Sequence, residues 1–290
     1  MGAIAAEQFV EQTRIFPERV RQLGLPDTSR FYWYHAIDLG DGLVTPGLYD
    51  YRQTIADFRF PDDMGGMTVL DVGSATGFFA FEFERRGARV VSTELPSLRD
   101  LDRFPGQSVE NSIRKIERMI FPDGLELESH RRGDSERELY RCLLEGPFRF
   151  CQQRLASKVE RCYSTIYDLT LEKTGVPEGF DLVFVGDVLL HTLYPLKALA
   201  ALAPMCRGEL VLAQMLPDGP QAPPAMAYVG GNDPDEDHIQ WWLPNKSCLL
   251  EMLMKLGFPV VDEVGWHSGI LMPGSYPFRR IILRARKPGA

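Results

Sequence analysis

The chain has 290 residues, 44% of them hydrophobic, and its formal net charge at pH 7 is −8. This length can bury a sizeable core in one large α/β domain with extensions or in two small domains. The acidic balance leaves no overall positive field to attract nucleic acid, although a local basic groove is still compatible with it. Five scattered cysteines without CxxC spacing, and no apolar run of about 18 residues, predict a cytoplasmic protein with no membrane partner.

Residues 1–60 predict an extension, or lid, packed on the core. Apolar positions at helical spacing over residues 4–23 indicate one or two short amphipathic helices, broken near Pro17. Five consecutive ring side chains follow at residues 31–35, more than one strand face can bury. The members of this cluster that we take as candidates for a pocket wall are Trp33, Tyr34 and His35. The alternative is that these rings only cap the sheet.

The stretch from residue 67 to 94 carries the clearest functional pattern. An apolar run of strand length ends on Asp71, a glycine turn follows, and a helical pattern continues over 78–86. A second apolar run, at 88–93, ends on Glu94. A glycine turn after one strand and an acid after the next are typical of an adenosine site in an open α/β sheet. The turn lacks the G-x-G-x-x-G spacing of a pyrophosphate site, so it suits a positively charged ligand without phosphate.

Residues 97–147 are longer than a normal crossover between strands and predict a helical insertion that covers the site or mediates association. Its charge run, from residue 126 to 138, is most simply a solvated face. After the insertion, helical and strand patterns alternate up to a hairpin-like end. The predicted helices and strands are 111–120, 135–144, 148–157, 159–164, 179–185, 188–205, 209–214, 246–256, 259–264 and 278–285. The helix 188–205 is expected to be interrupted early, by Tyr194-Pro195.

The segment Asp71-Val-Gly-Ser-Ala-Thr-Gly77 resembles the first motif, D-x-G-x-x-x-G, of class I S-adenosylmethionine-dependent methyltransferases. The resemblance implies an α/β fold with a Rossmann-like, seven-stranded, mostly parallel sheet and helices on both faces. It also implies a methyltransferase domain over residues 61–290, with an insertion at about 97–147 after the second core strand. The implied cofactor is S-adenosylmethionine.

The same resemblance implies roles for residues at the ends of the strands. Asp71 would lie near the amino acid part of the cofactor, and Glu94 would accept hydrogen bonds from both ribose hydroxyls. Asp168 would accept from the adenine amino group, and Asp187 would lie beside the methionine end. Further implied cofactor-binding residues are Gly73, Ser74, Gly77, Leu95, Ile166 and Tyr167.

A narrower resemblance is carried by the segments 33–38, 188–195, 241–245 and 276–280. They are similar to the methyltransferase group that includes the wobble-uridine tRNA carboxymethyltransferases, some of which use carboxy-S-adenosylmethionine. Arg280 falls where that family places an arginine against the extra carboxylate, but the matching lysine is absent before Tyr34. Many relatives that carry Trp-Trp-x-Pro-Asn look like plain methyltransferases, and this sequence resembles those relatives more closely. The remaining candidate substrate-binding residues are Tyr194, Trp241, Trp242 and Asn245.

Trp241 and Trp242 point to opposite faces if their segment is extended, so one of them is a candidate wall for a flat or cationic ligand. The alternative is packing against the glycine-rich loop. Methyl transfer to a hydroxyl needs alignment and removal of a proton, which a histidine can accept at neutral pH. His191, expected three residues into a helix, is the candidate base, with packing inside the helix as the alternative.

His35 is the second candidate base, while His238 and His267 are weaker candidates. No histidine spacing supports a metal. We therefore expect an enzyme that methylates an oxygen or nitrogen of a small molecule, such as a secondary metabolite. The alternative is a tRNA wobble-uridine transferase using carboxy-S-adenosylmethionine, and a third reading is a binding protein that has lost catalysis. The oligomeric state stays open, a dimer included.

Overall fold

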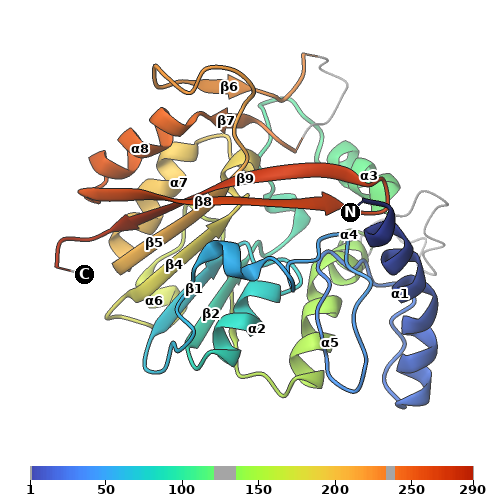
Figure 1. Ribbon diagram of the computed structural model, residues 1–290. Coiled ribbons are helices and arrows are strands. Elements are labelled where there is room, and N and C mark those ends of the chain that lie inside the picture. The colour runs from blue at the N-terminus through green and yellow to red at the C-terminus, as the bar shows by residue number, and fades with distance from the viewer. Residues whose placement is uncertain (1, 121–134, 233–238, 290) are drawn as a thin grey trace.

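The computed structural model describes residues 2–120, 135–232 and 239–289, and its centre is a seven-stranded sheet (Figure 1). The strand order is β3-β2-β1-β4-β5-β9-β8. Only β9 runs antiparallel to its neighbours. The predicted Rossmann-like class is therefore confirmed. The strands are β1 Thr68–Val72, β2 Arg89–Glu94, β3 Glu160–Tyr163, β4 Phe180–Gly186, β5 Cys206–Gln214, β8 Val260–Leu271 and β9 Tyr276–Arg286.

Helices cover both faces of the sheet, as Figure 1 shows. Successive residues of a strand point to opposite faces; thus Val69 packs in a core with α2 and α5, whereas Leu70 packs in a second core with α7 and α8. The near-continuous apolar strands follow from this double coverage. The helices are α2 Phe78–Arg85, α5 Gly146–Arg154, α6 Leu171–Thr174, α7 Pro195–Leu202 and α8 Lys246–Lys255.

The N-terminal helix α1, Gly2–Gln22, runs through Pro17 without a break, so the expected interruption there is wrong. Phe16 and Val20, four residues apart, are both 2% exposed and join the core that also holds Trp33. Burying two such side chains contributes about 3–6 kcal/mol, enough to offset a proline in the helix at about 3 kcal/mol. The division of the chain into an extension over 1–60 and a domain over 61–290 stays a prediction.

The insertion folds onto the end of β2. It contains the short turn η2, Leu98–Asp100, the helix α3, Val109–Ile120, and α4, Ser135–Tyr140, which passes through a π-helical turn directly into α5. The two helices expected over 135–157 are thus one continuous helical stretch, and most of the predicted charge run lies outside the described residues. The Tyr140 hydroxyl donates to the carbonyl oxygen of Leu95 over 2.6 Å, which tethers the stretch beside the sheet edge.

The helix expected over 188–205 is interrupted before Pro195, as predicted. The turn η4, Leu189–His191, comes first, α7 begins only at Pro195, and the turn η5, Ala203–Met205, follows. Pro195 is accepted at the first position of a helix, but it disfavours helical geometry at Tyr194, which has φ −127° and ψ 69° here. His191 therefore lies in a tight turn directly after β4 rather than inside a helix.

The last two strands are longer than predicted and form a ribbon beyond the sheet. β5 ends at Gln214 opposite Ile281, so His267 and Arg280, which face each other in the ribbon, lie past the sheet edge. Figure 1 shows this red ribbon projecting across the molecule. The Met272 amide of the ribbon donates to the Leu48 carbonyl over 3.1 Å, and the short turn η1, Ile55–Phe58, also contacts β8.

A small separate sheet pairs β6, Met226–Tyr228, with β7, Trp242–Pro244.

Candidate active site

A cavity of about 310 Å³ opens at the carboxyl ends of β1, β2 and β4, within the size range of small-molecule sites. Ligands bind at this edge of open α/β sheets because the connecting loops diverge there. Its walls come from the glycine turn, the insertion, the turn after β4 and the ribbon. The predicted site residues that line it are Tyr34, His35, Asp71, Gly73, Ser74, Glu94, Leu95, Ile166, Tyr167, Asp187, His191 and Arg280.

The Glu94 carboxylate is held against the glycine turn by both of its oxygens. Its Oε2 accepts from the Ala75 amide and its Oε1 from the Leu95 amide, each over 3.0 Å. Gly73 has φ +65°, and a Cβ there would lie 2.8 Å from Val188 Cγ2, so only glycine fits. The carboxylate is thus fixed at the cavity wall with lone pairs left over for two further donors.

Asp71 is 2% exposed, and its Oδ2 has no hydrogen-bond partner among the described residues. Burial raises the pKa of its carboxyl to about 7; the nearby Arg161 charge and a hydrogen bond from the Ala80 amide act in the opposite direction. An unpartnered buried carboxyl oxygen is costly unless a ligand supplies a donor or a positive charge. This atom is therefore the strongest sign of a cationic ligand in the cavity.

Arg161, on β3, supports the turn from below and was missed by the sequence reasoning. Its fully buried guanidinium donates to Ser74 Oγ over 2.9 Å and to the Ala75 carbonyl over 3.2 Å. It lies 3.7 Å from Glu94 Oε2 and 4.0 Å from the Phe148 ring centre. The only sign of this role in the sequence is that a charged residue stands inside a short strand of the core. Arg161 supplies a buried positive charge close to both Asp71 and Glu94.

Replacing Arg161 with methionine should lower the free energy of unfolding by about 3–5 kcal/mol, because it leaves buried carboxylates without their counter-charge. Urea unfolding followed by circular dichroism measures this. The matched control is Arg89→Met on the neighbouring strand, where Arg89 pairs with Glu160 over 2.9 Å but both side chains are about half exposed. That change should cost only about 0–1 kcal/mol. Equal losses in the two variants would contradict the role given to Arg161.

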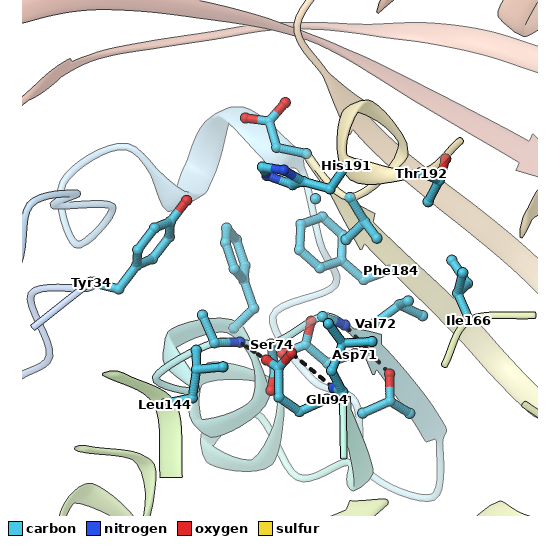
Figure 2. A pocket seen from close by; sticks show the side chains of 18 of the residues that line it. Tyr34, Asp71, Val72, Ser74, Glu94, Leu144, Ile166, Phe184, His191 and Thr192 are labelled. Carbon is cyan, nitrogen blue, oxygen red and sulfur yellow. Dashed lines mark hydrogen bonds between the residues drawn. The ribbon is translucent and has the colours of Figure 1, made fainter. Parts of the chain in front are cut away.

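His191 lines the cavity on the side away from the two carboxylates; Figure 2 shows Tyr34 and His191 across from Asp71, Ser74 and Glu94. Its Nδ1 lies 2.6 Å from the Ile239 carbonyl oxygen and must donate to it. The neutral ring therefore keeps Nε2 as a hydrogen-bond acceptor. Burial lowers the pKa of His191, so the imidazole is neutral at pH 7 and can accept a proton.

His35, the second candidate base, lies deeper in the wall. Its Nδ1 is 3.1 Å from Thr76 Oγ1, and its ring packs among Tyr34, Tyr51 and Phe78. Burial lowers the pKa of His35 to about 3, which makes it a weak proton acceptor. The structure favours His191 of the two.

Arg280 reaches the cavity from the ribbon and is paired inside it. Its Nε donates to Asp187 Oδ2, while Asp187 Oδ1 accepts from the Met215 amide over 3.0 Å. The guanidinium carbon lies 4.6 Å from the centre of the Phe278 ring. The positive charge of Arg280 is thus largely balanced by a carboxylate of this chain.

Several predicted site residues lie outside the cavity lining. Trp33 packs edge-on against Phe16, Phe31 and Phe150 in the core. Gly77 begins α2 at φ +94°, and a Cβ there would meet the Phe81 and Phe148 rings at 2.6 and 2.8 Å. Both residues serve packing in this structure.

The others belong to surface turns and the small sheet. Asp168 is exposed and accepts from Thr165 Oγ1 over 2.6 Å. Asn245 caps α8 by accepting from the Cys248 amide over 2.9 Å. Trp241 is buried against Phe104, whereas the remaining two, Trp242 and Tyr194, contact Tyr228 and Tyr167 respectively.

In the part of the chain that the structure describes, no group of three or more His, Cys, Asp or Glu side chains is arranged to hold a metal ion. His238 lies outside the described residues. No helix among them is long and apolar enough to cross a bilayer.

The strand order, with β9 antiparallel to both of its neighbours, is that of a Rossmann-like seven-stranded fold. No family model matches the chain. A solved structure, the N-terminal domain of EvdMO1 in the presence of SAH and D-fucose, superposes with a TM-score of 0.53 at 12% identity, over 95% of this chain and 97% of that one.

Two curated proteins are similar in sequence. The tRNA U34 carboxymethyltransferase of Dichelobacter nodosus (strain VCS1703A) is 28% identical over 213 residues, 72% of this chain and 50% of that protein. The magnesium-protoporphyrin O-methyltransferase of Rhodobacter capsulatus is 41% identical over 59 residues, 19% of this chain and 26% of that protein. The aligned part of the chain thus spans half the length of the first relative and about a quarter of the second.

Proposed function

We propose that this protein is an enzyme that transfers a methyl group from S-adenosylmethionine to an oxygen or nitrogen of a small-molecule acceptor. The observation that carries the proposal is the buried, unpartnered Oδ2 of Asp71 beside the glycine turn and the fixed Glu94 carboxylate. These carboxylate acceptors match a nucleoside that has a ribose diol and a cationic amino acid end.

The residues that would hold the cofactor follow from the cavity lining. Glu94 would accept from the ribose hydroxyls, and Asp71 would face the positively charged methionine end. Ile166 and Tyr167 line the cavity and would pack near the adenine ring, whereas Asp168 is exposed and is not part of the lining. When bound, S-adenosylmethionine supplies an electrophilic methyl group on a sulfonium leaving group. The protein then has to align the acceptor and remove its proton.

His191 is the group that we assign to proton removal. Its Nε2 is the free acceptor of a neutral ring whose other nitrogen is bonded to the Ile239 carbonyl, which holds the ring in one tautomer. The cavity around it is rich in aromatic rings, including Tyr34, Phe79 and Phe184. Such walls exclude water and favour a flat acceptor.

The direct experiment is calorimetric titration of the purified full chain with S-adenosylmethionine and S-adenosylhomocysteine, together with mass spectrometry of any copurifying ligand. We expect both nucleosides to bind at micromolar concentration or tighter. Absence of binding by both, with a folded protein by circular dichroism, would overturn the proposed cofactor.

The affinity for S-adenosylmethionine should depend on pH through Asp71. The pKa of this carboxyl is raised to about 7 in the free protein, and a cationic ligand prefers the ionised form. Binding therefore releases a proton, and the dissociation constant should rise as pH falls below 7, by up to about tenfold per pH unit. Calorimetry between pH 5.5 and 8.5 on wild type and Asp71→Asn isolates the contribution of Asp71 to this pH dependence. The ligand's own titration affects both proteins equally and therefore cancels in the comparison. An identical pH slope in the two proteins would contradict it.

A second candidate function is tRNA wobble-uridine modification with carboxy-S-adenosylmethionine. The similarity to the Dichelobacter nodosus protein and the position of Arg280 in the cavity favour it. The pairing of Arg280 with Asp187 and the net charge of −8 speak for the small-molecule acceptor instead. Tight tRNA binding that weakens steeply with salt, and preference for the carboxylated nucleoside, would decide for this second function.

A further inference from the structure

The part of the cavity next to Arg280 is a chamber between the N-terminal extension and the ribbon. His267 on β8 is 1% exposed and lines the cavity, directly opposite Arg280 in the ribbon. Its ring centre lies 5.0 Å from that of Tyr51, 5.1 Å from that of Phe58 and 5.5 Å from that of Phe278. Three aromatic rings therefore surround the imidazole, and the Arg280–Asp187 ion pair lies on the neighbouring strand side of the same cavity.

The two nitrogens of His267 are in different surroundings. Nδ1 lies 3.3 Å from Oδ2 of Asp57, a residue of η1 whose side chain is about two-fifths exposed. Nε2 is buried and has no hydrogen-bond partner among the residues that the structure describes. Burial lowers the pKa of His267, an effect that Asp57 partly offsets, so the ring is neutral at pH 7. Because Nδ1–H donates to the carboxylate, Nε2 is an acceptor without a donor.

The unpaired Nε2 of His267, surrounded by aromatic rings, indicates which chemical group a ligand would place beside it. Buried polar atoms in native proteins are nearly always hydrogen-bonded, so an exception that lines a cavity calls for a partner such as a ligand or a water molecule. The partner has to be a donor, since Nε2 carries a lone pair, and it has to reach the nitrogen between aromatic rings. A hydroxyl group on a flat ring meets both conditions, because the ring stacks or packs edge-on while the O–H points at the nitrogen.

We propose that the Asp57–His267 pair accepts a hydrogen bond from a hydroxyl group of an aromatic acceptor and thereby selects hydroxylated aromatic molecules as substrates. This inference rests on the proposed function, in that the acceptor occupies the same cavity as the cofactor. Asp57 is a positioning residue, since it holds the ring in the tautomer that leaves Nε2 free. Sites built for a substrate hydroxyl reject analogues without it far more strongly than apolar pockets reject a missing methylene.

The test uses 2-naphthol and its methyl ether, 2-methoxynaphthalene, as probes that differ in the hydroxyl proton. Both are titrated calorimetrically into the full chain, with and without saturating S-adenosylhomocysteine. Wild type should bind 2-naphthol at least roughly tenfold more tightly than the ether. In His267→Phe the affinity for 2-naphthol should fall to that for the ether, whereas His267→Gln, which keeps an acceptor oxygen, should recover part of the difference.

The controls separate this role from a structural one. Asp57→Asn should reduce the preference for 2-naphthol. Asp262→Asn, on the same ribbon but in an ion pair with Arg286 at the surface, should leave it unchanged. Imidazole ¹⁵N spectra of wild type should show the Nδ1–H tautomer of His267, and this signal should shift when 2-naphthol binds. Circular dichroism confirms that each variant is folded.

The outcomes are distinct for the two proposals. In one outcome S-adenosylhomocysteine does not bind, yet wild type prefers 2-naphthol and His267→Phe loses this preference. That outcome would overturn the proposed function but leave the role of the Asp57–His267 pair standing. Four other outcomes would each overturn the role of the Asp57–His267 pair. Wild type binds the two probes equally, wild type does not bind 2-naphthol, His267→Phe keeps the preference, or His267 is found as the Nε2–H tautomer.

Discussion

Replacing Glu94 with alanine should abolish measurable binding of S-adenosylmethionine by the folded protein. The carboxylate is 9% exposed, is held by the Ala75 and Leu95 amides, and lines the cavity at the end of β2. Each hydrogen bond to a charged group contributes about 1.5–3 kcal/mol, so losing two ribose contacts should weaken binding by roughly 10²–10⁴-fold. The variant also leaves the Ala75 amide of the glycine turn without its partner. Calorimetry with S-adenosylhomocysteine measures the change.

The matched control for this prediction is Glu160→Ala on β3. Glu160 is an exposed carboxylate at the opposite end of the neighbouring strand, paired with Arg89, and it does not line the cavity. Its removal should leave the affinity for the nucleoside within about twofold. Glu94→Gln, which keeps one acceptor oxygen, should fall between wild type and alanine. Should Glu94→Ala bind the nucleoside as tightly as Glu160→Ala does, the ribose assignment is wrong.

Replacing His191 with alanine should leave cofactor binding within about twofold and lower kcat by about 10²–10⁴-fold, the usual contribution of a general base. The reason is that Nε2 of His191 is the neutral acceptor facing the cavity, while the cofactor residues lie across from it. The rate is measured as release of S-adenosylhomocysteine with an acceptor identified by screening hydroxylated aromatic compounds.

The pH profile separates proton removal from a loss of packing at this position. Burial lowers the pKa of His191, so the base stays unprotonated at neutral pH and kcat of wild type should decline only in acid, below the ordinary histidine range. The acid limb should be absent in His191→Ala. His191→Gln, which restores the side-chain volume but cannot accept a proton, should remain as slow as alanine. A fast glutamine variant would show that His191 only fills space.

The two prolines show when a local sequence rule predicts the interruption of a helix and when it fails. Pro17 and Pro195 were both expected to disturb a helix, and only Pro195 does so. The difference comes from packing, since Phe16 and Val20 are buried on the core on either side of Pro17. After β4 the chain forms the turn η4 instead of a helix, and His191 at the end of this turn lines the cavity.

Aromatic residues show a second limit. Trp33 and Trp241 were candidates for a pocket wall, and both are buried in packing contacts instead. Tyr51 and Phe58 attracted no functional interpretation in the sequence, yet both line the cavity. A large ring is equally suited to a core and to a pocket, so its residue type and local spacing do not distinguish the two locations.

The sequence by itself predicted the Rossmann-like sheet and one wall of the cavity. Strand-end acids and a glycine turn are local features: Asp71, Gly73 and Glu94 are placed by the strands that carry them, and parallel strands bring their carboxyl ends to one edge. Only the tertiary structure decided the opposite wall of the cavity. Asp57 and His267 are 210 residues apart, and Arg161 reaches the glycine turn from a third strand. No spacing rule connects such residues, because their contact depends on how the extension and the ribbon pack over the finished sheet.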